Sequence, residues 1–175
     1  ISGVAVFAKN RESLADLRNH FGSGNCFFRF LFVTKAGLLE GTREIVADAP
    51  LMPHNTKPKM IPSTAKGKKS QTDFRLLAES DAGWALWEGT AAFLRPHQVR
   101  AHAAVIGLPI MGDELYEGPA IPILSELLPN KRTAGIGFPA FNGVALHLRE
   151  VRLPENEGLT EPFQVQAELP RHFRV

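Results

Sequence analysis

The sequence predicts an α+β fold, with a mixed, largely antiparallel β-sheet and flanking helices, in one domain over residues 1–175. Three observations support this prediction. Runs rich in apolar, β-branched and aromatic residues outnumber the segments with helical spacing. These runs do not alternate regularly with helices, so a doubly wound parallel sheet is not indicated. A hydrophobic share of 44% and a charged share of 22% are typical of a globular protein.

The chain opens with a predicted strand and a predicted helix. Residues 1–7 are largely apolar and suit a strand. Asn10 is a good N-cap for the helix that follows, and Gly22 is placed to end it. Apolar side chains recur at helical spacing between them: Leu14, Leu17 and Phe21. We therefore expect an amphipathic helix that packs on the sheet.

Further strands are expected along the rest of the chain. Residues 27–33 predict a buried strand, because aromatic and apolar residues fill that run. Residues 72–78 and 84–90 predict an antiparallel hairpin, joined by the turn at residues 80–83. Three other segments also read as strands, residues 43–46, 144–153 and 163–167. The sheet therefore draws on both halves of the chain.

A short helix is expected at residues 97–106. Pro96 suits the start of a helix, and Gly107 suits its end. Residues 118–139 have turn residues at both ends and read as a long connection, with a short helix near residues 124–128. The helices are therefore few and short.

Residues 53–71 predict an exposed basic loop. The segment is rich in Pro and Ser, and no acidic residue stands between Asp48 and Asp73. Its lysines are Lys57, Lys59, Lys66, Lys68 and Lys69. A charge run of this kind can be plain solvated surface, or it can bind a polyanion.

The composition restricts the setting of the protein. Cys26 is the single cysteine, so no disulfide can form within the chain and a reducing compartment is expected. We find no apolar run of about 20 residues and no leader, which favours a cytoplasmic protein without a membrane span. His97 and His102 are five residues apart and no cysteine cluster accompanies them, so we expect no metal site.

One stretch carries the most specific pattern in the chain. Residues 95–102 read RPHQVRAH, and residues 107–116 read GLPIMGDELY. The pair resembles the motif GRTHQIRVH followed by GHPIVGDPLY in RNA pseudouridine synthases of the ribosomal large-subunit type. The likeness extends over more than twenty positions with its gap in place, so it is far more specific than a short motif.

Both ends of the chain extend the resemblance. Residues 1–9 resemble the segment that follows the aspartate in the family motif HRLDxxTSG, with Ile1 on the threonine. The nucleophilic aspartate would then stand three residues before Ile1, and the chain would be an N-terminally truncated catalytic domain. Residues 145–147 resemble a late leucine-histidine strand, and residues 169–173 resemble a closing proline-phenylalanine tail.

The resemblance implies an activity and roles for particular residues. Enzymes of this family isomerise uridine to pseudouridine in structured RNA, ribosomal or transfer RNA, without a cofactor. An ionised aspartate needs a fixed cation beside it, and Arg100 is the candidate because a guanidinium offers paired donors to a carboxylate. Arg95, His97 and Gln98 would form the neighbouring rim and contact phosphates or the uridine. Lys66, Lys68 and Lys69 would grip the RNA backbone.

Three positions depart from the family pattern. Phe93 and Leu94 replace the threonine and glycine that precede the motif arginine, which adds bulk to that turn. Arg29 stands where the family has a tyrosine against the uracil ring. Phe30 would take that place if the register slipped by one, and it could stack on a base without exchanging a proton. We assign Asp113 and Tyr116 to structure.

Two functional hypotheses follow from the sequence. The first is an active RNA pseudouridine synthase, an isomerase, with an atypical pocket and an aspartate supplied upstream of Ile1. The alternative is a catalytically inactive RNA-binding module descended from the same family. We expect a monomer in either case. The residues encoded before Ile1 would separate the two hypotheses.

Overall fold

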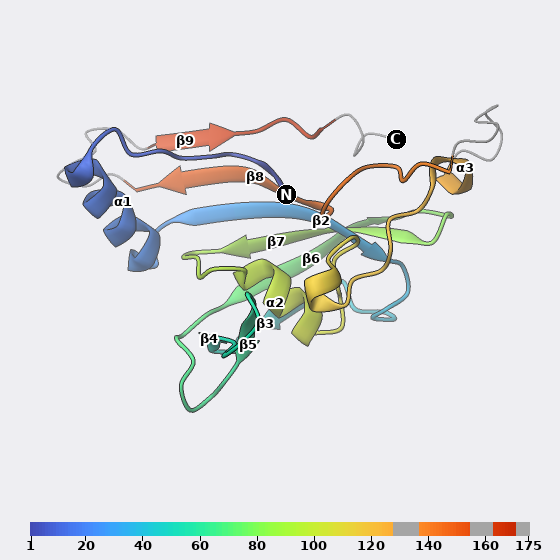
Figure 1. Ribbon diagram of the computed structural model, residues 1–175, viewed down its shortest axis with the longest axis horizontal. Helices are drawn as coiled ribbons and strands as arrows, with labels where there is room; N and C mark the ends of the chain where they lie inside the picture. Colours follow the sequence, from blue (N-terminus) through green and yellow to red (C-terminus); the bar gives the residue numbers. More distant parts are fainter. Residues whose placement is uncertain (128–136, 155–162, 171–175) are drawn as a thin grey trace.

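The computed structural model describes residues 1–127, 137–154 and 163–170 (Figure 1). Its main feature is a seven-stranded sheet in the order β1-β8-β2-β7-β6-β3, with β9 paired to β8 as well. All neighbouring strands in it are antiparallel except β1 and β8, which are parallel. The strands are β1 (Ser2–Gly3), β2 (Phe27–Lys35), β3 (Glu44–Ala47), β6 (Thr72–Glu79), β7 (Trp84–Ala91), β8 (Leu146–Leu153) and β9 (Phe163–Gln166). The predicted α+β fold with a mixed, largely antiparallel sheet is confirmed.

Strand β2 forms the centre of the sheet, between β7 and β8. Side chains alternate between the two faces of a strand, so its two faces have different chemistry. Phe28, Phe30 and Phe32 point into the hydrophobic core, whereas Arg29 points to the opposite face. On the core side, Phe32 meets Phe74 of β6 edge to face, with ring centroids 5.7 Å apart. The predicted buried strand is therefore present and somewhat longer than expected.

The hairpin of β6 and β7 agrees with its prediction. The turn closes with hydrogen bonds from the Gly83 amide to the Ser80 carbonyl and from the Ser80 amide to the Trp84 carbonyl. Gly83 has φ of 81°, a conformation that glycine adopts without strain. Gly89 of β7 lies against Phe74, which leaves room for helix α2 on that face.

Strand β1 is shorter than the sequence predicts. Only Ser2 and Gly3 pair with β8, and one further hydrogen bond runs from the Val4 amide to the Leu148 carbonyl. Strand β9 occupies the same edge of β8 from Glu150 onward, so residues after Val4 have no free edge to extend along. Residues 5–7 therefore do not belong to the strand.

Two helices pack on the face that carries the phenylalanines. Helix α1 (Arg11–Ser23) begins where expected, with the Asn10 side chain accepting from the Ser13 amide at 2.8 Å. It ends at Gly24, which has φ of 83°, rather than at the predicted Gly22. Phe21 of this helix meets Phe28 of β2 edge to face. Helix α2 (Gln98–Val105) covers β6 and β3 on the same face (Figure 1).

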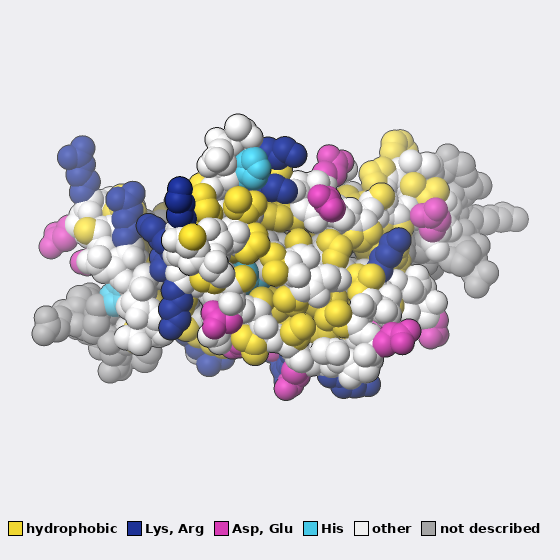
Figure 2. Space-filling model, turned by 90° about the horizontal axis from the view of Figure 1, so that it is seen from below, with side chains coloured by type: hydrophobic (Ala, Val, Ile, Leu, Met, Phe, Trp, Pro, Cys, Tyr) yellow, Lys and Arg dark blue, Asp and Glu magenta, His cyan; other side chains and the backbone are white. Residues whose placement is uncertain are grey.

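The predicted basic loop contains regular structure. Residues 51–71 include a small hairpin of β4 (Leu51–Pro53) and β5 (Met60–Pro62), which packs on α2. The backbone of Lys68 exchanges two hydrogen bonds with Leu51, at 2.8 and 2.9 Å. The lysine-bearing segment is therefore anchored at both ends. Figure 2 shows several Lys and Arg side chains toward the left of the face seen from below.

The long connection after α2 is partly as predicted. The short helices η1 (Glu114–Tyr116) and α3 (Leu124–Leu127) lie on it. Residues 128–136 of the expected connection, and residues 171–173 of the expected closing tail, lie outside the described residues. Among the helices of residues 1–127, 137–154 and 163–170, none has the length and apolar character that a membrane crossing requires.

Candidate active site

The motif at residues 95–116 folds into one polar cluster between α2 and η1. Arg100 of α2 donates from Nε and Nη2 to the two carboxylate oxygens of Asp113, each at 2.6 Å. The pair is largely shielded from solvent, with side-chain exposures of 12% for Arg100 and 1% for Asp113. This bidentate hydrogen bonding raises the pKa of Arg100.

The partner of Arg100 differs from the one that the sequence predicted. We expected its paired donors to face an aspartate upstream of Ile1, but Asp113 of this chain occupies that edge of the guanidinium. Asp113 directly follows Gly112 in a tight turn, so the loop carries its carboxylate under α2. Arg100 is therefore a largely enclosed residue that ties η1 to α2, and its pairing with an upstream aspartate stays a prediction.

Tyr116 connects this pair to the β4–β5 hairpin. Its hydroxyl accepts from the Met60 amide at 2.8 Å, and its ring lies under the Arg100 guanidinium at 5.1 Å. Lys59 lies over the same ring at 5.8 Å. Burial raises the pKa of Tyr116, so the phenol keeps its proton near neutral pH. The tyrosine thus holds the basic hairpin against the motif.

Gln98 has a different role from the one predicted. Its side chain is 2% exposed, so it cannot form part of an open rim. Its Oε1 accepts from the Arg95 amide at 2.9 Å, and its Nε2 donates to the Gln71 carbonyl at 2.8 Å. A longer bond of 3.3 Å reaches the Thr72 hydroxyl. Gln98 fixes the turn that carries Arg95 and does not contact a ligand itself.

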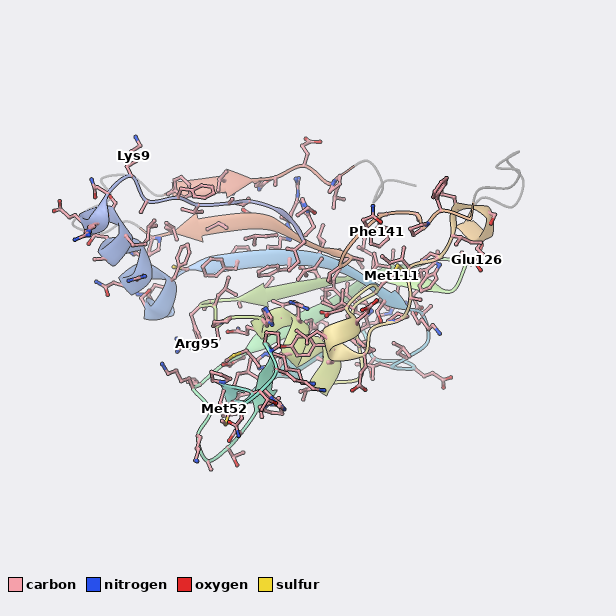
Figure 3. All side chains as sticks on the ribbon, viewed as in Figure 1. Lys9, Met52, Arg95, Met111, Glu126 and Phe141 are labelled. Carbon is pink, nitrogen blue, oxygen red and sulfur yellow. The ribbon has the colours of Figure 1, made fainter. Side chains whose placement is uncertain are left out.

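Arg95 and His97 remain accessible beside this turn. The Arg95 side chain extends over Phe93 at 5.2 Å, and its Nε lies 3.4 Å from the Lys69 carbonyl. Figure 3 shows Arg95 above Met52, on the side of the β4–β5 hairpin. Phe93, which departs from the family pattern, thus supports the arginine with its ring. The structure brings Arg95, His97 and the end of the basic segment together.

The predicted lysines are exposed on that segment. The side chains of Lys66, Lys68 and Lys69 are all open to solvent, while backbone bonds hold the segment itself. A hydrogen bond from the Gly67 amide to the Ser63 carbonyl closes the turn that carries them. They form an ordered cationic edge next to Arg95.

His102 is a buried structural residue of the motif. Its Nδ1 lies 2.9 Å from the Thr72 hydroxyl and its Nε2 lies 2.9 Å from the Ala49 carbonyl. Burial lowers the pKa of His102, although the Ala49 carbonyl opposes the shift. The side chain is fully enclosed and joins α2 to β6 and to the segment before β4.

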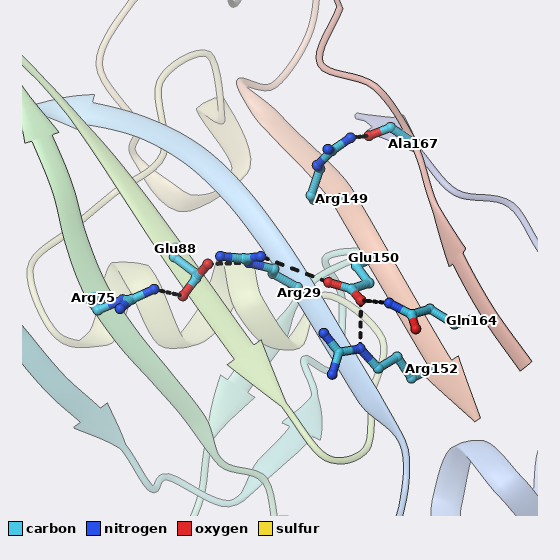
Figure 4. Close-up of polar contacts among 8 residues, drawn as sticks. All are labelled: Arg29, Arg75, Glu88, Arg149, Glu150, Arg152, Gln164 and Ala167. Carbon is cyan, nitrogen blue, oxygen red and sulfur yellow. Dashed lines mark hydrogen bonds and ion pairs between the residues drawn. The ribbon is translucent and has the colours of Figure 1, made fainter. Parts of the chain in front are cut away.

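Arg29 belongs to a second polar cluster, on the face of the sheet opposite α2 (Figure 4). Its Nε donates to Glu88 of β7, and its Nη1 lies 3.9 Å from Glu150 of β8. Glu88 also accepts from Arg75 at 2.8 Å. The structure therefore does not bring Arg29 together with the residues of the motif, and Glu88 holds it across the strand.

Glu150 is the other buried acid of this cluster. It accepts from Arg152 and from Gln164, each at 2.6 Å (Figure 4). The Arg152 hydrogen bond lowers the pKa of Glu150 despite its burial. Arg152 in turn lies over the ring of Phe27 at 4.7 Å. Sequence reasoning missed both acids, because a lone glutamate in a strand shows neither its face nor its cross-strand partner.

Phe30 is corrected from a substrate contact to a core residue. Its side chain is 8% exposed and lies with Phe28 and Phe32 in the main hydrophobic cluster. A one-residue slip of β2 would move this whole row of phenylalanines to the polar face, so the register is firmly set. Phe30 therefore does not offer a ring to a base.

The three stretches that carry the family resemblance meet in space. Ser2 of β1 lies beside His147 of β8, with the Ser2 hydroxyl 2.9 Å from Nδ1 of the histidine. A Cβ placed on Gly143 would lie 4.0 Å from the Ile1 nitrogen, and one placed on Gly112 would lie 2.3 Å from the Gly143 carbonyl. The loop that carries Asp113 therefore lies near the start of the chain. Chain order alone would not show this proximity.

Metal ligands are not grouped in the described structure. Within residues 1–127, 137–154 and 163–170, no three His, Cys, Asp or Glu side chains gather in a way that could hold a metal ion.

Comparisons with known proteins find relatives in sequence and in fold. No protein-family model matches the chain. Ribosomal large subunit pseudouridine synthase C of Rickettsia conorii is 29% identical over 127 residues, which are 73% of this chain and 42% of that protein. Dual-specificity RNA pseudouridine synthase RluA of Yersinia pestis is 28% identical over 152 residues, which are 85% of this chain and 71% of that protein.

A solved structure shares the fold. Human RNA pseudouridylate synthase domain containing 4 superposes with a TM-score of 0.65 and 18% identity, over 94% of this chain and 66% of that one. The chain therefore has the fold of pseudouridylate synthase domains. The chain is similar in sequence to RluA-like RNA pseudouridine synthases over most of its length. It spans less than half the length of the Rickettsia protein.

Proposed function

We propose that residues 1–175 form a catalytic domain that isomerises uridine to pseudouridine in structured RNA, ribosomal RNA first of all. The observation that carries this proposal is the meeting of three family segments: β1, the leucine-histidine strand β8, and the loop from Arg95 to Tyr116. Of the two named relatives, one is a ribosomal large subunit pseudouridine synthase and the other a dual-specificity RNA pseudouridine synthase.

The reaction needs no cofactor and conserves every atom of the nucleotide. The bond from C1′ of the ribose to N1 of uracil breaks, the base turns, and C1′ bonds to C5. The hydrogen on C5 then leaves as a proton, and N1 gains one. By the family resemblance, an aspartate three residues before Ile1 supplies the nucleophile.

Arg95, His97 and the exposed lysines supply the RNA contacts in this proposal. Arg95 extends beside the Lys69 carbonyl, and the nearby lysines add positive charge along the same edge. Phosphate contacts of this type release counterions, so the affinity should fall as salt rises. In this proposal, Arg100 positions this surface through Asp113.

Release of tritium tests the activity. RNA labelled at C5 of uridine loses tritium to water when C5 forms its bond to C1′. The full-length protein should release it, and a variant with asparagine in place of the aspartate that we expect before Ile1 should not. Absence of any release from ribosomal or transfer RNA, with binding intact, would reject the isomerase.

One observation favours a second candidate, an RNA-binding module without catalysis. Arg29 stands at the position of the family tyrosine, and Glu88 engages its Nε. Such a chain would bind RNA with the same salt dependence and leave C5 labelled. The residue encoded three positions before Ile1 separates the candidates, because any residue other than aspartate there favours the binding module.

A further inference from the structure

We propose that His97 presents its Nε2–H group as a fixed, uncharged hydrogen-bond donor to an acceptor oxygen of RNA, and that Tyr116 is the positioning residue that holds it. The identity of the ligand rests on the proposed function. The arrangement of the two side chains does not. Neither residue is given this role by the comparisons with known proteins.

The backbone of His97 is the first observation. His97 has φ of 51°, and Glu117 is the only other non-glycine residue with positive φ in the part of the chain that the structure describes. Residues other than glycine rarely adopt a positive φ. The backbone strain of this conformation persists only where surrounding contacts hold it. His97 precedes the first residue of α2, yet its side chain makes no capping hydrogen bond. The imidazole points elsewhere, toward Tyr116.

The hydrogen bonds set the tautomer of the imidazole. The Tyr116 oxygen accepts from the Met60 amide at 2.8 Å, and it lies 3.3 Å from His97 Nδ1. The phenol has one proton, and Nδ1 is the acceptor within its reach. A neutral imidazole that accepts at Nδ1 carries its proton on Nε2. The rings meet nearly edge to face, with centroids 5.9 Å apart and planes at 77°.

The charged groups around His97 favour the neutral form. Arg100 of α2 lies over the same tyrosine ring, and Lys59 before β5 lies on that ring as well. Asp113 is the nearby acid, but both of its oxygens bind Arg100. Burial and the Arg100 charge lower the pKa of His97, and Asp113 opposes them. An imidazolium would thus stand beside other cations.

An uncharged donor suits an acceptor oxygen next to a cationic edge. Arg95 is two residues before His97, its side chain reaches the Lys69 carbonyl, and in the proposed function these residues carry the positive charge that holds phosphates. In this proposal His97 adds a directional hydrogen bond to the RNA without adding positive charge. The acceptor is either a phosphate oxygen or the O4 carbonyl of uridine, since cytidine has an amino donor at that position.

Nitrogen NMR and RNA binding test the proposal together. In the parent protein at pH 7.5, two-dimensional spectra of the imidazole should show Nε2 protonated and Nδ1 bare. In Tyr116→Phe, the neutral form loses its partner at Nδ1, so the two tautomers should mix and the pKa of His97 should rise. An Nδ1–H tautomer, or an imidazolium at pH 7.5, in the parent protein would overturn the proposal.

The binding arm uses His97→Gly, because glycine accepts positive φ without strain and the fold should persist. We expect about 5-fold weaker binding to oligouridylate, close to the value of one neutral hydrogen bond. The salt slope should stay as in the parent, because no charge is lost. Lys68→Gln is the matched control and should lower that slope. Parent-like affinity of the glycine variant would reject the donor.

Oligocytidylate separates the two acceptors. If His97 contacts a phosphate, His97→Gly weakens binding of both oligomers equally. If it contacts O4, only oligouridylate binding weakens. Neither assay requires isomerisation, so a result for His97 stands even where tritium release fails. A parent protein that binds no RNA would reject both this inference and the proposed function.

Discussion

Two polar clusters, one between α2 and η1 and one on the face of the sheet opposite α2, look alike in composition and differ in their access to water. Behind α2, Arg100 and Asp113 are both nearly enclosed, with side-chain exposures of 12% and 1%. On the other face, Glu88 is buried at 8%, but its partner Arg75 is 52% exposed. A carboxylate whose cation can return to water loses less when the pair breaks. The first cluster should therefore hold the fold, whereas the second should tolerate change.

The largest expected effect is the loss of the enclosed acid. Asp113→Ala leaves a buried guanidinium without its partner, so the free energy of unfolding should fall by about 3–5 kcal/mol. Urea denaturation followed by tryptophan fluorescence measures it. Asp81→Ala, in the exposed hairpin turn, is the control and should change it by less than about 0.5 kcal/mol. A loss below about 1 kcal/mol for Asp113→Ala would contradict the comparison.

A second, smaller effect concerns the neutral part of the same cluster. Gln98→Ala removes the side-chain hydrogen-bond partners of the Arg95 amide and the Gln71 carbonyl, so we expect the free energy of unfolding to fall by about 2 kcal/mol. The exposed Gln71→Ala removes a bond only to Asp73 and serves as the control in the same urea experiment. Equal losses in the two variants would mean that burial of Gln98 has no special weight.

The pH dependence follows from the enclosed histidine. The pKa of His102 is lowered in the folded state. As pH falls below about 6.5, His102 therefore binds a proton in the unfolded chain before it does so in the folded chain. Stability should thus drop with falling pH, by at most about 1.4 kcal/mol at pH 5.5. Measuring in His97→Gly removes the other histidine whose pKa is lowered. A flat profile between pH 7.5 and 5.5 would show that folding does not depend on a neutral His102.

The smallest effect belongs to the open face. Glu88→Gln keeps the shape of the side chain and frees Arg29 and Arg75 to hydrate, so the loss should stay below about 1 kcal/mol. It should shrink further in 1 M salt, where the screening length is about 3 Å. The loss caused by Asp113→Ala should hardly respond to salt. Similar salt responses of the two variants would remove the distinction between the faces.

Local sequence patterns predicted most of the elements. Local sequence is enough to predict the cap at Asn10, the turn before Trp84 and the aromatic strand β2, because capping, turn geometry and alternation act within a few residues. The hairpin of β4 and β5 escaped prediction. Its strands are three residues long, and Tyr116 and α2 hold them from far along the chain.

The site was predicted by position more than by role. Resemblance located the stretch from Arg95 to Tyr116, but it could not show that Asp113 takes both donors of Arg100 or that Gln98 turns inward. Those outcomes depend on which side of α2 each residue faces once η1 folds back. Asp113 and Tyr116 were assigned to structure. Tyr116 also orients His97, which no spacing rule revealed.

The sequence by itself determined the fold class, the resemblance to a family and the elements that carry the motif, because periodicity, capping and a long gapped motif are properties of neighbouring residues. Only the tertiary structure decided the pairings: Arg100 with Asp113, Arg29 with Glu88, and His97 with Tyr116. The physical reason is that charge pairs and tautomers depend on burial and on distances of a few ångströms between distant residues. Such distances are set only when the chain folds and brings these residues together.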